Sequence, residues 1–213
     1  EFKDDSGLIK IDFIKEISAL VNSFIEQGMS YIDSSMSDEE KLLAIHDYLI
    51  REVDYDYENY QNNTIPYESY SITGVVKNQL VVCEGYSRTF QILSRSVGIP
   101  CIIVSSDAMN HAWNMVNLNG YWYHIDTTWD DIDSGSTLYR HFLCSDDEIE
   151  EEGHYDWVHS SQIIIDNSDI KTAPAAMSDA YQDYFFANID YYGISGSSSY
   201  NNGYWYYTYG ENT

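Results

Sequence analysis

The chain has 213 residues, of which 44% are hydrophobic, enough for one domain with a full core. Its formal charge of −25 opposes binding to nucleic acid and to anionic membranes. Because it lacks any run of about 18 apolar residues, the sequence predicts no membrane-spanning helix, and its three cysteines imply no disulfide framework.

Two amphipathic helices are predicted at the N-terminal end. Apolar residues recur at helical spacing over residues 8–28, and Ser37-Asp-Glu-Glu40 has the form of a capping box that starts a second helix ending near Val53. His46 lies on this second helix, where we expect a structural histidine with satisfied hydrogen bonds. Residues 54–73 are polar and rich in tyrosine, and we predict a long loop near a cleft.

The third predicted helix begins at Cys83. Its apolar face consists of residues at spacings of four, three and four, namely Tyr86, Phe90, Leu93 and Val97, and Gly98-Ile-Pro100 ends it. The positive end of the helix dipole favours a thiolate at Cys83, and its free backbone N–H can point at a developing oxyanion. The alternative is that Cys83 is a small buried hydrophobic residue, as most free cysteines are.

A strand over residues 100–105 and then a β-hairpin are predicted next. Residues 112–118 and 121–127 have strand-like composition, and Asn119-Gly120 between them is the strongest short hairpin signal. A two-residue loop sets the register, in which Leu118 faces Tyr121.

This register brings a histidine and an aspartate together. Asp126 lies opposite Trp113 and His111 lies opposite Thr128, so His111 and Asp126 are diagonal neighbours on one face of the hairpin. Such neighbours are within reach of a side-chain hydrogen bond. A carboxylate there would orient the imidazole, as a base that serves a nucleophilic Cys83 requires.

The signals after the hairpin are weaker. Residues 140–144 are predicted to form a strand, residues 146–152 an acidic patch, and residues 130–135 a solvated acidic turn that lacks the spacing of a calcium loop. His124-Ile-Asp126 and the pair His154 and His159 are conceivable metal ligands, but neither Cys-x-x-Cys nor His-Glu-x-x-His is present. We therefore expect no metal and no other cofactor.

The composition shifts after Pro174. Nine tyrosines fall between Tyr181 and Tyr209 among glycine and asparagine turn residues, which predicts short strands and turns. We divide the chain into a helical segment (1–35), a central domain (36–173) and a tyrosine-rich β extension (174–213). The extension is expected to pack on the central domain, with a lead into a further domain as the alternative.

Five segments together carry a family resemblance. They are Lys41-Leu-Leu-Ala-Ile-His-Asp-Tyr-Leu, Val82-Cys-Glu-Gly-Tyr-Ser, Val97-Gly-Ile-Pro, His111-Ala-Trp-Asn and Tyr123-His-Ile-Asp-Thr-Thr-Trp-Asp. In this order, from about Ser37 to Asp131, they resemble the transglutaminase-like superfamily, a branch of the papain-like fold. The resemblance implies an α+β domain whose nucleophile helix packs on an antiparallel β-sheet.

The resemblance also implies a catalytic triad. Cys83 would be the nucleophile, His111 the general base and acid, and Asp126 the orienting carboxylate. The spacings of 28 residues from Cys83 to His111 and 15 more to Asp126 argue against a papain-type protease, whose histidine lies much further downstream.

The implied chemistry is acyl transfer on protein or peptide amides through a thioester. Water gives hydrolysis, which we take as the first choice, and a lysine amine gives the isopeptide of a protein-glutamine transglutaminase. A catalytically silent cell-surface binding domain is the third hypothesis. Tentative cleft residues are Gln79, Tyr67 and Tyr86 as second oxyanion donors, and Trp113 and Trp129 as cleft walls or core residues.

The expected partner is a protein or peptide substrate, with no nucleic acid and no membrane insertion. The tyrosine-rich end is a candidate for contact with cell-wall or surface polymers. A low-cysteine, acidic, tyrosine- and asparagine-rich composition suits an exported protein at the surface of a bacterium, and the start at Glu1-Phe-Lys resembles the interior of a longer polypeptide.

Overall fold

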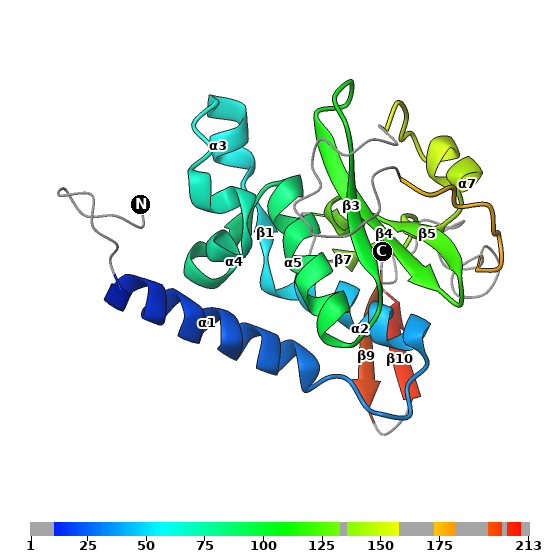
Figure 1. Cartoon of the computed structure of the whole chain (residues 1–213), viewed down its shortest axis with the longest axis horizontal. Helices are drawn as coiled ribbons and strands as arrows, with labels where there is room; N and C mark the ends of the chain where they lie inside the picture. Colours follow the sequence, from blue (N-terminus) through cyan, green and yellow to red (C-terminus); the bar gives the residue numbers. More distant parts are fainter. Residues whose placement is uncertain (1–10, 133–135, 158–172, 182–195, 202–203, 210–213) are drawn as a thin grey trace.

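The computed structural model describes residues 11–132, 136–157, 173–181, 196–201 and 204–209 (Figure 1). The helical elements are α1 (Ile11–Met29), α2 (Asp38–Glu52), α3 (Tyr57–Asn62), the 3-10 helix η1 (Tyr67–Tyr70), α4 (Ile72–Asn78), α5 (Cys83–Ser96), α6 (Thr127–Asp130) and α7 (Asp146–Glu151). The strands are β1 (Asp54–Tyr55), β2 (Leu80–Val81), β3 (Cys101–Ser106), β4 (His111–Leu118), β5 (Tyr121–Ile125), β6 (Asp131–Ile132), β7 (Ser136–Thr137), β8 (Phe142–Cys144), β9 (Gly196–Asn201) and β10 (Tyr204–Tyr209).

The centre of the fold is an antiparallel sheet with α5 packed on it. The strand order is β3-β4-β5-β8, and α5 contacts both β3 and β4 (Figure 1). Two hydrogen bonds join helix and sheet, because the Ser87 hydroxyl donates to the Ala112 carbonyl at 2.9 Å and the Asn114 amide donates to the Ser87 carbonyl at 3.0 Å. The predicted α+β class, with the nucleophile helix on an antiparallel sheet, is confirmed.

The first two predicted helices are present. α1 covers the described part of the first, and α2 begins with the predicted capping box, in which the Glu40 carboxylate accepts from the Ser37 N–H at 2.7 Å. The nine consecutive residues 42–50 of α2 are buried, and its apolar side chains form one core cluster with α5 and the sheet.

The long loop predicted over residues 54–73 is wrong. This segment contains β1, which pairs in parallel with β2, and then α3, η1 and the start of α4. The reason is a buried carboxylate: Asp56 accepts hydrogen bonds from Asn59 at 2.8 Å and from Ser69 at 2.7 Å. These two contacts fold a polar segment on itself, and polarity alone gave no sign of them.

The β4–β5 hairpin has the predicted register, with Leu118 paired to Tyr121. Asn119 and Gly120 both have positive φ (54° and 91°), as a type I′ turn requires. The second strand ends at Ile125, two residues before the prediction, because the Asp126 side chain caps α6. The expected pairing of His111 with Thr128 is therefore absent.

Alternation along β4 divides the buried residues into two layers. Val116 and Leu118 belong to the core between the sheet, α2 and α5, whereas Trp113 and Met115 belong to a second cluster that includes Ile149 of α7. His111 starts the strand on the same alternating face as Trp113, and their rings stack with centroids 5.7 Å apart.

Two strands lie within the range of the predicted β extension. β9 and β10 pair antiparallel, and β9 continues through β7 to β6, which directly follows α6. Residues 182–195 of the extension lie outside the described residues, and the division into domains remains a prediction. Among the residues that the structure describes, none of the helices combines the length and apolar character needed to cross a membrane.

Candidate active site

The site begins at the N-terminus of α5, where Cys83 is the first helical residue. The strand residue Val81 and the extended Val82 lead into it, and the Val82 N–H donates to the Ser69 carbonyl at 2.9 Å. Within the described part of the chain, the Cys83 N–H has no acceptor. Cys83 is half-buried, whereas Cys101 and Cys144 are buried, so only Cys83 combines a helix N-terminus with access to solvent.

Gly85 allows this helix start to lie close to the preceding segment. A Cβ at Gly85 would lie 2.5 Å from the Ser69 carbonyl oxygen and 2.6 Å from the Val81 Cβ. Real carbon atoms do not approach so closely, so a glycine is required for α5 to sit where it places Cys83.

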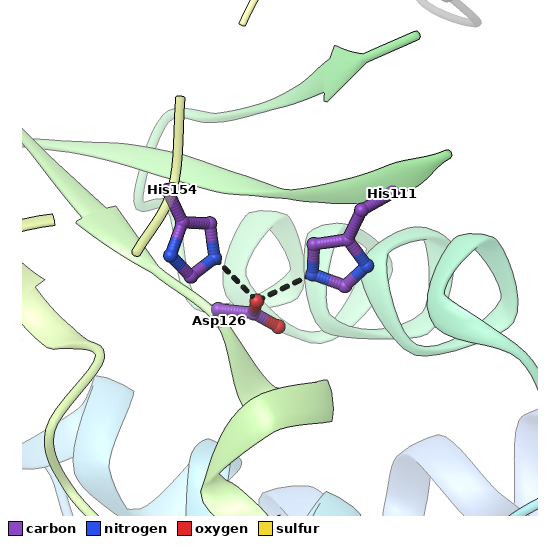
Figure 2. A group of neighbouring side chains, drawn as sticks. All are labelled: His111, Asp126 and His154. Carbon is purple, nitrogen blue, oxygen red and sulfur yellow. Dashed lines mark hydrogen bonds and ion pairs between the residues drawn. The ribbon is translucent and has the colours of Figure 1, made fainter. Parts of the chain in front are cut away.

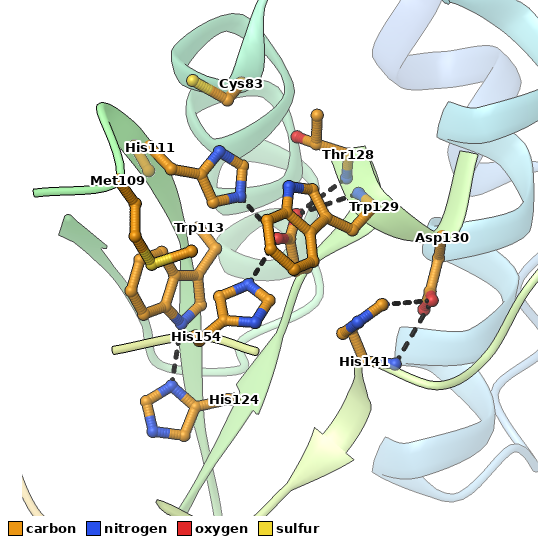
Figure 3. A network of polar contacts seen from close by, with 12 residues as sticks. Cys83, Met109, His111, Trp113, His124, Thr128, Trp129, Asp130, His141 and His154 are labelled. Atoms are coloured by element: carbon orange, nitrogen blue, oxygen red, sulfur yellow. Dashed lines mark hydrogen bonds and ion pairs between the residues drawn. The ribbon is translucent and has the colours of Figure 1, made fainter. Parts of the chain in front are cut away.

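His111 and Asp126 meet as the hairpin geometry predicts. His111 Nε2 lies 2.6 Å from Asp126 Oδ2 (Figures 2 and 3), and Cys83 lies on the opposite side of the ring (Figure 3). The second oxygen, Oδ1, accepts from the N–H groups of Thr128 at 2.9 Å and Trp129 at 3.3 Å. The same aspartate therefore caps α6 and orients the imidazole.

The charges in this group support one another. Burial alone would lower the pKa of His111, but the Asp126 carboxylate, together with Cys83, raises it to about 10. Burial raises the pKa of Asp126, yet the charge and hydrogen bond of His111 and the hydrogen bond of His154 hold it well below its usual range. At neutral pH the site therefore holds an imidazolium beside an ionised Asp126.

His154 is an unexpected fourth member of the group. Its Nε2 lies 2.8 Å from Asp126 Oδ2, so one carboxylate oxygen contacts two imidazole rings (Figure 2). The sequence offered His154 only as a weak metal ligand. It follows α7 in an irregular segment, 28 residues beyond Asp126, so no periodicity indicated this contact. His159, its suggested partner, lies outside the described residues.

A second histidine–aspartate group lies at the other end of α6. Asp130 is fully buried and contacts His46 Nε2 at 3.1 Å and His141 Nδ1 at 2.8 Å. The predicted solvated turn is therefore wrong at Asp130, because two buried histidines replace water as its partners. His46 is the satisfied structural histidine that we expected, and it also contacts Asp47 at 3.2 Å.

The group around Asp126 has the donor types of a metal site. The ligand atoms of His111, Asp126 and His154 all lie within 4.8 Å of one another. Donor atoms of a tetrahedral zinc site, with bonds of about 2.0–2.1 Å, lie about 3.4 Å apart. The oxygen–nitrogen distances of 2.6 and 2.8 Å are shorter than this and fit hydrogen bonds.

Two cavities adjoin the site and share His111, Asn110, Tyr55 and Tyr60 in their walls. One has a volume of about 320 Å³ and contains Cys83; its other wall residues are Ile65, Tyr70, Val82, Glu84, Ser105, Ser106, Asp107 and Ala112. The other has a volume of about 590 Å³ and is walled on the far side of His111 by Tyr57, Met109, Thr128, Trp129, Asp131 and Ile132. The His111 imidazole thus lies where the two cavities meet, and the Cys83 thiol lines the smaller one.

The tentative oxyanion donors point elsewhere. The Gln79 amide donates to the Glu52 carbonyl at 3.2 Å, and the Tyr86 hydroxyl donates to Asp131 and lies 3.1 Å from the Val53 carbonyl oxygen. Tyr67 is 82% exposed and belongs to neither of the two cavities.

The two tryptophans have different positions. Trp113 is fully buried and donates to His124 at 2.9 Å, so it is a core residue. Trp129 walls the larger cavity and stacks on His111 with ring centroids 5.3 Å apart. Tyr55, which the sequence did not single out, lies beside Cys83 in the wall of the smaller cavity. Burial makes the largest contribution to raising the pKa of Tyr55, and the charge at Cys83 makes the second largest.

Comparison with known proteins identifies the family. The model of the transglutaminase-like superfamily matches residues 27–127, which include α2, the Cys83 helix and the hairpin up to Asp126. This segment belongs to the transglutaminase-like superfamily. The predicted resemblance is thereby confirmed.

Two curated relatives share this part of the chain. The kyphoscoliosis peptidase of Mus musculus is 28% identical over 141 residues, which are 60% of this chain and 20% of that protein. The kyphoscoliosis peptidase of Homo sapiens is 28% identical over 112 residues, 46% of this chain and 17% of that protein. The match thus spans about a fifth of these longer relatives. Among solved structures, a TGase shows 24% identity and a TM-score of 0.46, covering 58% of this chain and 34% of its own.

Proposed function

We propose that this protein catalyses thiol-dependent acyl transfer on protein or peptide amides, with hydrolysis as the outcome. The observation that carries the proposal is the His111 Nε2–Asp126 Oδ2 contact of 2.6 Å, with Cys83 at the helix N-terminus on the opposite side of the ring. A nucleophile, a base and an orienting group in this order form the constellation of nucleophilic catalysis.

The proposed reaction starts from the ion pair. The proton of the Cys83 thiol resides on His111, and the thiolate sulfur attacks the amide carbonyl carbon to give a tetrahedral oxyanion. His111 then gives its proton to the leaving amine nitrogen as the carbon–nitrogen bond breaks, which leaves a thioester. A water molecule attacks this thioester, His111 takes its proton, and the acid product leaves as the thiolate forms again.

The oxyanion requires hydrogen-bond donors that are fixed before the reaction. The Cys83 N–H, which has no acceptor among the described residues and lies at the positive end of the α5 dipole, supplies one. For the second donor we propose the Tyr55 hydroxyl, because Tyr55 walls both cavities and lies beside Cys83.

The shape and charge of the cavities support an extended, amine-bearing substrate. A peptide that crosses from one cavity to the other passes the thiol and the imidazole in turn. Glu84, Asp107 and Asp131 contribute carboxylates to the walls, and none of the wall residues that the structure describes is a lysine or an arginine. Walls of one sign concentrate ligands of the opposite sign, so basic residues near the scissile amide are favoured.

Access of water supports hydrolysis over cross-linking. Cys83 is half-buried rather than enclosed, and the cavities on both sides of His111 give water a route to a thioester. The chemistry up to the thioester is the same for a transglutaminase. The fate of the acyl group therefore has to be measured directly.

The test offers both acceptors at once. Wild-type protein and Cys83→Ala are incubated with proteome-derived peptides that contain lysine and glutamine, together with a fluorescent primary amine. Cys83-dependent new peptide termini, unaffected by the amine, support hydrolysis. Incorporation of the amine at glutamine without cleavage would replace hydrolysis by cross-linking, and an absence of both products would overturn the proposed function.

The remaining predictions concern the protein outside this site. Contact with cell-wall or surface polymers through residues 174–213, and a location outside a bacterial cell, are proposals from composition. If the chain is a silent binding domain, pull-down by wall glycan survives Cys83→Ala and depends on the tyrosine-rich end. Binding that persists without residues 174–213 would contradict that role.

A further inference from the structure

We propose that His154 is a positioning residue of this site, which holds the Asp126 carboxylate in the orientation that His111 needs. The inference rests on the proposed function, because it assigns His154 a role in activating Cys83.

Each of the two Asp126 carboxylate oxygens accepts two hydrogen bonds. Backbone N–H groups of Thr128 and Trp129 hold Oδ1, while the Nε2 atoms of His111 and His154 lie 2.6 and 2.8 Å from Oδ2. Without His154, one lone pair of the buried Oδ2 would have no hydrogen-bond donor. The carboxylate would then be free to turn toward another donor. His154 thus fixes the second oxygen as the helix cap fixes the first.

The proton on His154 is set by its surroundings. Because Asp126 is ionised and accepts, His154 Nε2 carries the hydrogen, and His154 Nδ1 is buried with no partner among the described residues. Burial lowers the pKa of His154, and the neighbouring positive charges of His141 and His111 lower it further against the pull of Asp126. His154 therefore acts as a neutral donor, which leaves the negative charge of Asp126 to His111.

The His154 ring is held by its neighbours. Its centroid lies 4.2 Å from that of Trp129 and 4.8 Å from that of Trp113 (Figure 3). Its backbone N–H donates to the Ile149 carbonyl at 3.0 Å, which ties it to the end of α7. His154 lines neither of the two cavities beside Cys83, so it acts on the reaction through Asp126.

The experiment compares variants by the pH dependence of iodoacetamide labelling at Cys83. His154→Leu keeps the volume and removes the donor, whereas His154→Gln places an amide N–H near the former Nε2 position. His124→Gln is the matched control, since His124 is equally buried and contacts Trp113 and Asp146 but not Asp126.

We expect a midpoint about one pH unit higher in His154→Leu, so that labelling at pH values below both midpoints is about tenfold slower than in wild type. His154→Gln should restore the wild-type midpoint, and His124→Gln should lower the melting temperature without moving the midpoint. If His154→Leu does not fold, His154→Asn replaces it, because the shorter amide cannot reach Oδ2.

Two outcomes would overturn the inference: a wild-type midpoint in a folded variant that lacks the donor, or equal impairment of His154→Leu and His154→Gln. An NMR titration of the His111 ring in a Cys83→Ala background tests it without reference to acyl transfer. We expect His154→Leu to lower the pKa of His111 by about one unit there; an unchanged value would overturn it. If Cys83 is labelled at the same rate in wild type and in His111→Ala, the proposed function is overturned instead.

Discussion

Asp126→Asn removes the charge on which the activation of Cys83 depends and changes little else in shape. If the amide oxygen keeps the contacts of Oδ1 with Thr128 and Trp129, the amide N–H₂ faces the N–H groups of His111 and His154. The two N–H bonds of the amide then face the N–H groups of the two imidazoles, and neither side offers an acceptor. His111 must either lose this contact or move its hydrogen to Nδ1, where it can no longer accept the proton of Cys83.

The expected loss of labelling rate follows from the pKa of His111. After burial, which opposes it, Asp126 makes the largest contribution to raising the pKa of His111 from 6.5 to about 10, a difference of about 5 kcal/mol in favour of the imidazolium. Without that stabilisation His111 no longer holds the proton of Cys83. A free thiol, with a pKa of about 8.5, is about 0.3% ionised at pH 6, so we expect labelling at pH 6 to fall strongly, by at most about 300-fold.

The assay measures the rate constant of iodoacetamide labelling at pH 6 by mass spectrometry of the Cys83 peptide. Asp130→Asn is the matched control. Asp130 lies on the same helical turn as Asp126, is also buried and also contacts two histidines, but it contacts neither His111 nor Cys83. We expect it to lose stability in urea and keep the wild-type rate. Equal rates for wild type and folded Asp126→Asn would refute the reasoning.

Three further predictions concern the helix start, the pH dependence of stability and the charge of the cleft. Gly85→Ala should lower the free energy of unfolding in urea by at least about 1–3 kcal/mol, because the new Cβ would lie 2.5 Å from the Ser69 carbonyl oxygen. An unchanged urea midpoint would contradict this close approach. Because the pKa of His111 is raised in the folded state, its stabilising contribution is complete below about pH 6.5 and is lost as the pH rises through about 10. The difference in unfolding free energy between wild type and His111→Gln should shrink over that interval, and a constant difference would argue against the shift. A cationic methanethiosulfonate should label Cys83 about tenfold faster than an anionic one at low salt, less so in Asp107→Asn, and a ratio near one would rule out a negative cleft.

Features set by neighbouring residues could be predicted from the sequence. The Asn119-Gly120 turn fixed the register of the hairpin, and with it the meeting of His111 and Asp126, because a two-residue loop permits one pairing. The apolar face after Cys83 placed the thiol at a helix start, and the capping box at Ser37 gave the start of α2. In each case the pattern lies in the same helix or hairpin as the interaction that it indicates.

Features set by distant contacts could not be predicted. Asp130 has the composition of an exposed turn, yet His46, 84 residues away, and His141 satisfy it in the interior. Asp56 likewise folds the segment predicted as a loop through Ser69, and His154 reaches Asp126 from an irregular segment. A buried carboxylate shows no periodicity, so its partners become visible only in the folded chain.

The most direct test of the account is the pH profile of iodoacetamide labelling at Cys83, measured against Cys101, Cys144 and a His111→Ala variant. We expect Cys83 to be labelled rapidly well below pH 8.5, with the fast reaction lost in the variant and absent at the two buried cysteines. Slow labelling of Cys83, or labelling that is indifferent to His111, would contradict the claim that these residues form an activated thiolate–imidazolium pair.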